Sequence, residues 1–106
     1  MNASEFLVRI AEIEIDPARL DDYRAAVNEE IEASVRLEPG VIALYAVALR
    51  DHPNHIRVFE IYASEAAYTA HLETPHFKKY KAATQDIVKS LRLFDTTPIV
   101  LGTGAK

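Results

Sequence analysis

A run of apolar residues from Val41 to Arg50 limits the possible folds of this chain more than any other stretch. It is too short to cross a membrane as a helix, for which about 18 consecutive apolar residues are needed. Pro39-Gly40 precedes it, and Asp51-His52-Pro53-Asn54 follows it with residue types that favour turns. We therefore predict a strand buried on both faces, paired in a hairpin with a second strand from His55 to Tyr62.

The second strand of this hairpin has two different sides, because successive side chains alternate across a strand. One side carries Ile56, Val58, Glu60 and Tyr62, and the other carries Arg57, Phe59 and Ile61. A carboxylate among apolar neighbours usually needs a partner. Glu60 is therefore a candidate functional residue. The structural alternative is a hydrogen bond that ties the strand to His71 or to a backbone N–H.

The first third of the chain predicts a strand followed by a helix. Residues 5–15 are rich in β-branched and aromatic residues and end in alternation of isoleucine with acidic residues. Asp16-Pro17 then supplies a helix cap and a proline suited to the first helical position. An apolar helical stripe follows and ends before Glu38-Pro39-Gly40; it consists of Leu20, Tyr23, Val27, Ile31 and Val35.

The last third predicts a broken helix and a final strand. Ser64 is a suitable cap for a short helix that ends near Leu72, and Thr74-Pro75 interrupts the pattern and starts a second helix. The final strand is expected from Leu91 to Asp95. The stripe of the second helix consists of Phe77, Tyr80, Thr84, Ile87, Val88 and Leu91.

The resulting order, β-α-β-β-α-β, describes a ferredoxin-like α+β fold with an antiparallel sheet and helices on one face. Helices on one face leave the other face of the sheet uncovered, yet the first two strands are apolar on both sides. An apolar sheet face of this size in water exceeds what soluble monomers usually tolerate. We therefore predict a homodimer that packs through its sheet faces.

Length and composition limit the class of protein. The 106 residues predict one domain, residues 1–106, with loose ends at about 1–4 and 102–106. The absence of cysteine excludes thiolate chemistry and fits a reducing compartment, and the first residues do not resemble a signal peptide, so we predict a cytoplasmic protein. The net charge of −4 and the lack of a basic stretch argue against nucleic acid as a partner.

Two histidines flank the helix break and are the first candidates for acid-base chemistry. His71 is expected in the last turn of one helix and His76 in the first turn of the next, so the helix dipoles favour the imidazolium at His71. A structural role at the helix ends is the alternative for each. Five positions across a break are not the spacing of a helical ligand pair, and no third ligand lies beside them, so no metal is predicted.

Aromatic residues could form the wall of a binding site near these histidines. Tyr45, Tyr62, Tyr68 and Phe77 are the candidates, and an ordinary place in the core is the alternative for each. The sequence contains no glycine-rich phosphate loop, no nucleophile elbow and no dinucleotide fingerprint. Any redox chemistry would therefore proceed without nicotinamide or flavin bound in the usual folds.

Three segments of the chain resemble the antibiotic biosynthesis monooxygenase family, which includes quinol monooxygenases. They are Glu38-Pro39-Gly40-Val41, Glu60-Ile61-Tyr62 and the stretch from His71 to Phe77, of which the last is the most specific. The resemblance implies a small dimeric α+β barrel, and it places His71, His76 and Glu60 at pocket-lining positions. Some members oxidise quinols or phenols with molecular oxygen and use no metal or organic cofactor, whereas others degrade haem.

The chain has no tryptophan, which disfavours the haem-degrading members and some polyketide-oxidising members. The resemblance thus implies an enzyme that oxidises a small aromatic quinol or phenol: His71 or His76 removes a proton, Glu60 orients the ring, and tyrosines hold it. Two alternatives remain. One is an isomerase of a small phosphosugar-like carbonyl compound, for which Arg57, Lys78 and Lys79 are the available cations. The other is a non-catalytic dimeric ligand-binding protein.

Overall fold

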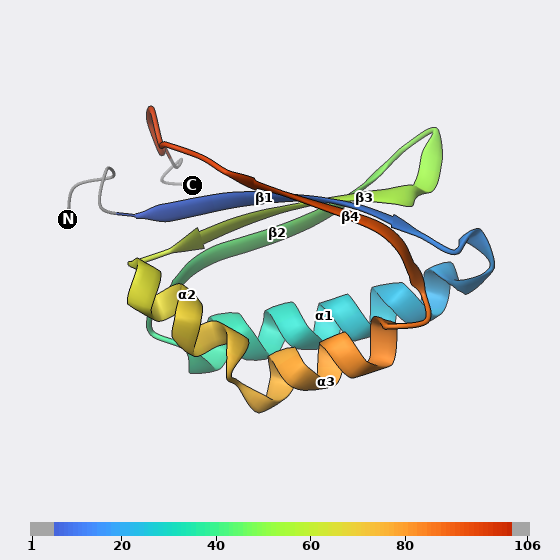
Figure 1. Ribbon diagram of the computed structural model, residues 1–106, viewed down its shortest axis with the longest axis horizontal. Helices are drawn as coiled ribbons and strands as arrows, with labels where there is room; N and C mark the ends of the chain where they lie inside the picture. Colours follow the sequence, from blue (N-terminus) through green and yellow to red (C-terminus); the bar gives the residue numbers. More distant parts are fainter. Residues whose placement is uncertain (1–5, 103–106) are drawn as a thin grey trace.

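The computed structural model describes residues 6–102, which form one sheet and the helices beside it (Figure 1). None of these helices is both long and apolar enough to span a membrane. The elements in chain order are β1 (Leu7–Ile15), the 3₁₀ helix η2 (Pro17–Arg19), α1 (Leu20–Leu37), β2 (Val41–Leu49), β3 (His52–Tyr62), α2 (Glu65–Leu72), α3 (Pro75–Thr84) and β4 (Val88–Asp95).

The four strands lie in the order β2-β3-β1-β4, and every neighbouring pair is antiparallel. Figure 1 shows α1, α2 and α3 on the same side of the sheet, with α3 running beside α1. The predicted ferredoxin-like α+β fold is confirmed. The sheet therefore has two different faces. The inner face meets the helices, and the outer face meets none of the described helices.

The capping residues predicted from the sequence begin their helices as expected. The side chain of Asp16 accepts a hydrogen bond from the backbone N–H of Ala18, and Ser64 accepts one from Ala67. Thr74 accepts one from Phe77, and its own hydroxyl donates to the carbonyl oxygen of His71 at 2.8 Å. The Thr74 side chain thus hydrogen-bonds both to the last turn of α2 and to the first turn of α3.

Two predicted boundaries and one position of the apolar helical stripe differ from the structure. The hairpin turn is only Arg50-Asp51, because Leu49 already pairs with His52. Helix α3 ends at Thr84, so Val88 and Leu91 belong to β4 and not to a helical stripe. Val35 is 53% exposed, because the buried side of α1 passes through Glu30 and Ser34. A stripe drawn through apolar residues alone could not include those two polar side chains.

The core lies between the inner face of the sheet and the helices. Its largest cluster surrounds Tyr23, which is fully buried and shares a 2.8 Å hydrogen bond with the Tyr80 hydroxyl of α3. Strand β2 is buried on its inner face only, contrary to the prediction for both faces, because no helix of the described chain covers the other side. The remaining buried members of the main cluster are Ala11, Ile13, Ile15, Ile56 and Ile87.

The outer face carries a continuous apolar row across all four strands. Tyr45 pairs with Phe59, Phe59 with Ile10, and Ile10 with Phe94. Tyr45 is 58% and Phe59 is 43% exposed. Beside this row lies a charged row in which Glu12 contacts Arg57 at 3.6 Å. The outer face therefore combines an exposed apolar centre with paired charges.

Gly40 is required by a close contact between the start of β2 and helix α2. A methyl group on its Cα would lie 2.5 Å from the Cβ atom of Ala67. Its φ angle is not positive, so the contact and not the backbone conformation demands glycine. We expect Gly40→Ala to lower the free energy of unfolding by about 1–3 kcal/mol, as overpacked sites do. Urea denaturation followed by circular dichroism measures this change.

Ala67→Gly provides the matched control for this prediction. Alone it should destabilise the protein by about 1 kcal/mol, the usual cost of glycine within a helix. Combined with Gly40→Ala it removes the clashing methyl group, so the double variant should be more stable than the sum of the two single effects predicts. Strict additivity would show that the two positions do not clash.

Candidate functional site

A cavity of about 540 Å³ opens between the inner face of the sheet and the helices. This volume suits a small organic ligand. Strand β3 contributes Val58, Glu60 and Tyr62 to its lining, because these side chains share the inner side of the strand. Helices α2 and α3 contribute His71 and Phe77 from the two sides of the break between them.

Five of the seven residues predicted for the site line this cavity: Glu60, Tyr62, Tyr68, His71 and Phe77. The structure does not bring Tyr45 to it. Tyr45 follows Leu44, which lines the cavity, and therefore points to the outer face of the sheet. His76 does not line it either, and its Nε2 contacts Glu38 instead.

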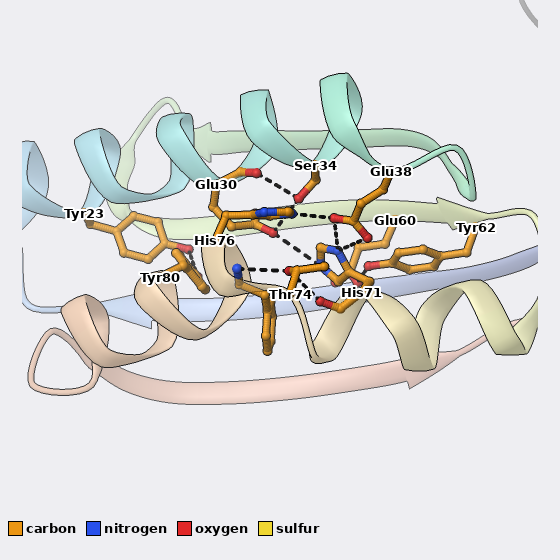
Figure 2. Close-up of polar contacts among 11 residues, drawn as sticks. Tyr23, Glu30, Ser34, Glu38, Glu60, Tyr62, His71, Thr74, His76 and Tyr80 are labelled. Carbon is orange, nitrogen blue, oxygen red and sulfur yellow. Dashed lines mark hydrogen bonds and ion pairs between the residues drawn. The ribbon is translucent and has the colours of Figure 1, made fainter.

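Glu60 is the carboxylate of β3 that faces the cavity. The Tyr62 hydroxyl, on the same side of the strand, donates a hydrogen bond to its Oε1 at 2.7 Å (Figure 2). Burial raises the pKa of Glu60 above its ordinary value, although this hydrogen bond and the charges of His71 and Arg9 act in the other direction. The site therefore contains a carboxyl group whose proton affinity is greater than that of a solvated one.

Aromatic rings form one wall of the cavity. The Tyr62 and Tyr68 rings meet edge to face, with centroids 5.1 Å apart and an interplanar angle of 63°. The ring of His71 lies 5.3 Å from that of Tyr62 and 5.1 Å from that of Phe77. These contacts fix the rings against one another and present apolar surface to a ligand.

His71 is buried, with 3% of its surface exposed, and both of its ring nitrogens face carboxylates. Its Nδ1 lies 3.0 Å from Glu38 Oε2, and its Nε2 lies 3.3 Å from Glu30 Oε1. Burial acts to lower the pKa of His71, but the hydrogen bonds with Glu30 and Glu38 outweigh it and raise the pKa. Each ring nitrogen of His71 therefore faces a carboxylate before any ligand binds.

Glu38 joins the two histidines. Besides its contact with His71, it lies 2.6 Å from His76 Nε2 through Oε2 (Figure 2). Burial acts to raise the pKa of Glu38, but the hydrogen bonds from His76 and His71 lower it overall. The carboxylate therefore belongs to a small charged cluster at the ends of three helices.

Glu30 and Glu38 are the residues of this site that sequence reasoning missed. Glu30 is 6% exposed on the inner side of α1, three residues after Val27 and four before buried Ser34. That spacing could have identified Glu30 from the sequence, because it places a carboxylate on the apolar stripe of the helix. Glu38 was assigned to the end of the helix and to a segment that resembles the family, but not to the site. Its pairing with His71 spans 33 positions and leaves no local pattern.

The cations predicted for a phosphorylated substrate lie elsewhere. Arg57 pairs with Glu12, Lys78 with Glu73, and Lys79 with Glu29, and none of the three lines the cavity. Arg9 of β1 does line it, with its guanidinium 4.7 Å from the centroid of the Tyr68 ring. That guanidinium already contacts Asp95 at 3.0 Å. Lys81 of α3 also lines the cavity. Most of the remaining lining is apolar or aromatic, which favours an aromatic ligand.

Comparisons with known proteins agree with one another. The family model described as antibiotic biosynthesis monooxygenase matches residues 6–83. A crystal structure of a protein of Bacteroides thetaiotaomicron VPI-5482, assigned by its name to these monooxygenases, is 54% identical in sequence. The match has a TM-score of 0.93 and covers 99% of this chain and 100% of that one. A search of curated proteins finds no match.

Two further solved structures extend the comparison. A protein of Lactobacillus acidophilus NCFM named as a monooxygenase is 32% identical, with a TM-score of 0.83, over 85% of this chain and 43% of that one. A protein of Nitrosomonas europaea, named like the Bacteroides protein, has a TM-score of 0.85 over 93% of this chain and 95% of that one. At 19% identity the latter shows a shared fold only.

Proposed function

Because this chain belongs to the antibiotic biosynthesis monooxygenase family, we propose that it oxidises a small aromatic quinol or phenol with molecular oxygen in the cavity described above. The observation that carries the proposal is the position of Glu60. This carboxylate lines an aromatic-walled cavity, is oriented by the Tyr62 hydroxyl, and has a pKa raised by burial. These are the properties of a general base for a weakly acidic hydroxyl group.

Glu60 takes the proton in this proposal, and His71 has a different part from the one expected from the sequence. Both ring nitrogens of His71 are engaged by Glu30 and Glu38, so the ring is held in one orientation. It serves as part of the aromatic wall, beside Tyr62 and Phe77. His76 positions Glu38 and acts from outside the cavity.

The oxidation balances without an added reductant. Glu60 accepts the hydroxyl proton of the quinol, and the resulting anion transfers one electron to oxygen. The substrate radical and superoxide combine at a ring carbon to give a hydroperoxide. Loss of the ring proton and cleavage of the O–O bond leave a new carbonyl group on the ring and release water, which takes its protons from the substrate through Glu60. The quinol supplies all four electrons, and one oxygen atom enters the product.

Oxygen uptake with a panel of quinols and phenols tests the proposal. We expect uptake that requires the protein and follows saturation kinetics, together with one atom of isotopically labelled oxygen in the product. A panel that includes two-ring and one-ring quinols covers the sizes that the cavity admits. Absence of uptake with every compound, or a product oxygen that derives from water, would contradict the proposal.

We further propose that the chain forms a homodimer through the outer face of its sheet. The apolar row from Tyr45 through Phe59 and Ile10 to Phe94 supports this, because it crosses every strand and no helix of the described chain covers it. Two such rows packed together would remove the exposed apolar surface from water. Tyr45, which does not reach the cavity, would then contribute to this interface.

A further inference from the structure

Three ligand-type side chains meet where the helices end. Glu38 directly follows α1, His71 lies in the last turn of α2, and His76 lies in the first turn of α3. Their donor atoms, one from each residue, all lie within 4.8 Å of one another. All three side chains are largely buried: exposure is 12% for Glu38, 4% for His71 and 13% for His76. The sequence prediction of no third ligand considered chain neighbours only, whereas Glu38 is brought there by the fold.

The short contacts in this cluster require a proton or a metal ion between each pair of atoms. Glu38 Oε2 lies 3.0 Å from His71 Nδ1 and 2.6 Å from His76 Nε2. A carboxylate oxygen and an unprotonated ring nitrogen both carry lone pairs, which repel at such distances. Either protons or a metal ion must therefore occupy the space between them.

We propose that Glu38, His71 and His76 bind a divalent first-row transition metal ion of the zinc class. Two imidazole nitrogens and one carboxylate oxygen form a donor set that zinc and its neighbours accept. Metal–ligand bonds of about 2.0–2.2 Å place tetrahedral donors about 3.3–3.6 Å apart. The Glu38 oxygens lie 3.0 and 3.2 Å from His71 Nδ1, so this pair must separate by only a few tenths of an ångström. His76 Nε2, which lies 2.6 Å from Glu38 Oε2, must move away by about 0.7–1 Å.

Glu30 provides an independent observation in favour of a metal. Histidine ligands usually donate their second ring N–H to a carboxylate, which fixes the tautomer and the ring orientation. His71 Nε2 lies 3.3 Å from Glu30 Oε1, and the Ser34 hydroxyl donates to the same oxygen at 3.0 Å. This supporting shell leaves Nδ1 of His71 directed at Glu38, on the side where the metal would lie.

The site is distinct from the cavity. Only His71 among the three ligands lines the cavity, and it does so with the ring whose Nδ1 points away toward Glu38 (Figure 2). A bound ion would join the ends of three helices and hold the His71 ring in place. Three protein ligands leave the remaining coordination positions to water. No step of the proposed oxidation passes through this ion.

Binding of Zn²⁺ and Co²⁺ to the full chain, first treated with a chelator, tests the proposal. Titration calorimetry should show one Zn²⁺ per chain, and Co²⁺ should give visible absorption bands typical of a site with nitrogen ligands. His76→Ala and Glu38→Gln should each weaken binding by at least about 100-fold, because each removes a direct ligand and second-shell losses alone cost about 10–100-fold. Unchanged affinity in both variants would overturn the proposal.

The exposed hairpin offers a matched control. His52 and His55 have ring centroids 5.4 Å apart, and His55 lies 4.0 Å from Glu14, so this pair could capture metal adventitiously. The double variant His52→Ala/His55→Ala should bind Zn²⁺ as tightly as the wild type. If it loses the ion while His76→Ala retains it, the site is on the hairpin and the proposal is wrong.

Imidazole NMR signals of the unmodified protein keep the test independent of whether the variants fold. Addition of one equivalent of Zn²⁺ should shift the signals of His71 and His76 and leave those of His52 and His55 in place. The reverse pattern would overturn the proposal. These measurements use no substrate, so their failure leaves the proposed oxidation untouched. Oxygen uptake in the presence of a chelator tests that oxidation separately.

Discussion

Glu60→Gln is expected to lower kcat for quinol oxidation by about 10²–10⁴-fold, the usual contribution of a general base. Glutamine has nearly the same size and still accepts the hydrogen bond that the Tyr62 hydroxyl donates to Glu60. The cavity and its aromatic wall are thus retained, and KM should change only a few-fold. Initial rates of oxygen uptake over a range of quinol concentrations separate the two parameters.

The pH dependence of the wild type gives a second measurement of the same role. Only the carboxylate form of Glu60 accepts a proton, so kcat/KM should rise with pH as Glu60 loses its proton. Burial raises the pKa of Glu60, so this rise should lie above the ordinary carboxyl value of about 4.3. Glu60→Gln should lack the rise, whereas Tyr62→Phe should keep it. Full activity of Glu60→Gln would show that the base is another group.

Phe59→Glu is expected to weaken the proposed dimer by about 10³-fold or more. Phe59 lies in the centre of the apolar row, between Tyr45 and Ile10. A carboxylate there would be buried without a partner in a packed pair of sheets, at a cost of several kcal/mol. Each tenfold change in the dissociation constant of the dimer corresponds to about 1.4 kcal/mol. Sedimentation velocity over a range of protein concentrations measures the shift from dimer to monomer.

The folded chain itself should tolerate this substitution, because Phe59 is 43% exposed in the single chain. Val35→Glu is the matched control: Val35 is an exposed apolar residue of α1, away from the outer face of the sheet. It should leave the dimer intact. A wild-type protein that sediments as a monomer at every concentration would contradict the dimer proposal directly.

Local patterns predicted the elements of this fold well. The alternation in β3 correctly placed Val58, Glu60 and Tyr62 on one side, because the period of a strand is independent of its neighbours. The caps at Ser64 and Thr74 were likewise predictable, since a cap binds a backbone group only three residues away. The boundary between α3 and β4 was not, because the apolar spacing there suited either element.

Part of the candidate site was predicted from the sequence, and the contacts that were missed all join residues far apart in the chain. Glu60 and the aromatic wall lie on regular elements whose sides could be assigned in advance. Sequence reasoning did not anticipate the two carboxylates that face the ring nitrogens of His71, because Glu30 comes from α1 and Glu38 directly follows it. Even the raised pKa of His71, expected from the helix dipole, results instead from its hydrogen bonds with Glu30 and Glu38.

The sequence by itself determined the order of strands and helices, the break at Thr74-Pro75 and the side of β3 that carries Glu60. These depend on short-range periodicity and on hydrogen bonds between residues close in the chain. Only the tertiary structure decided that Glu38 lies between His71 and His76 and that Tyr45 faces away from the cavity. Such contacts depend on how helices pack across the sheet, and that packing is set by the shape of the whole core.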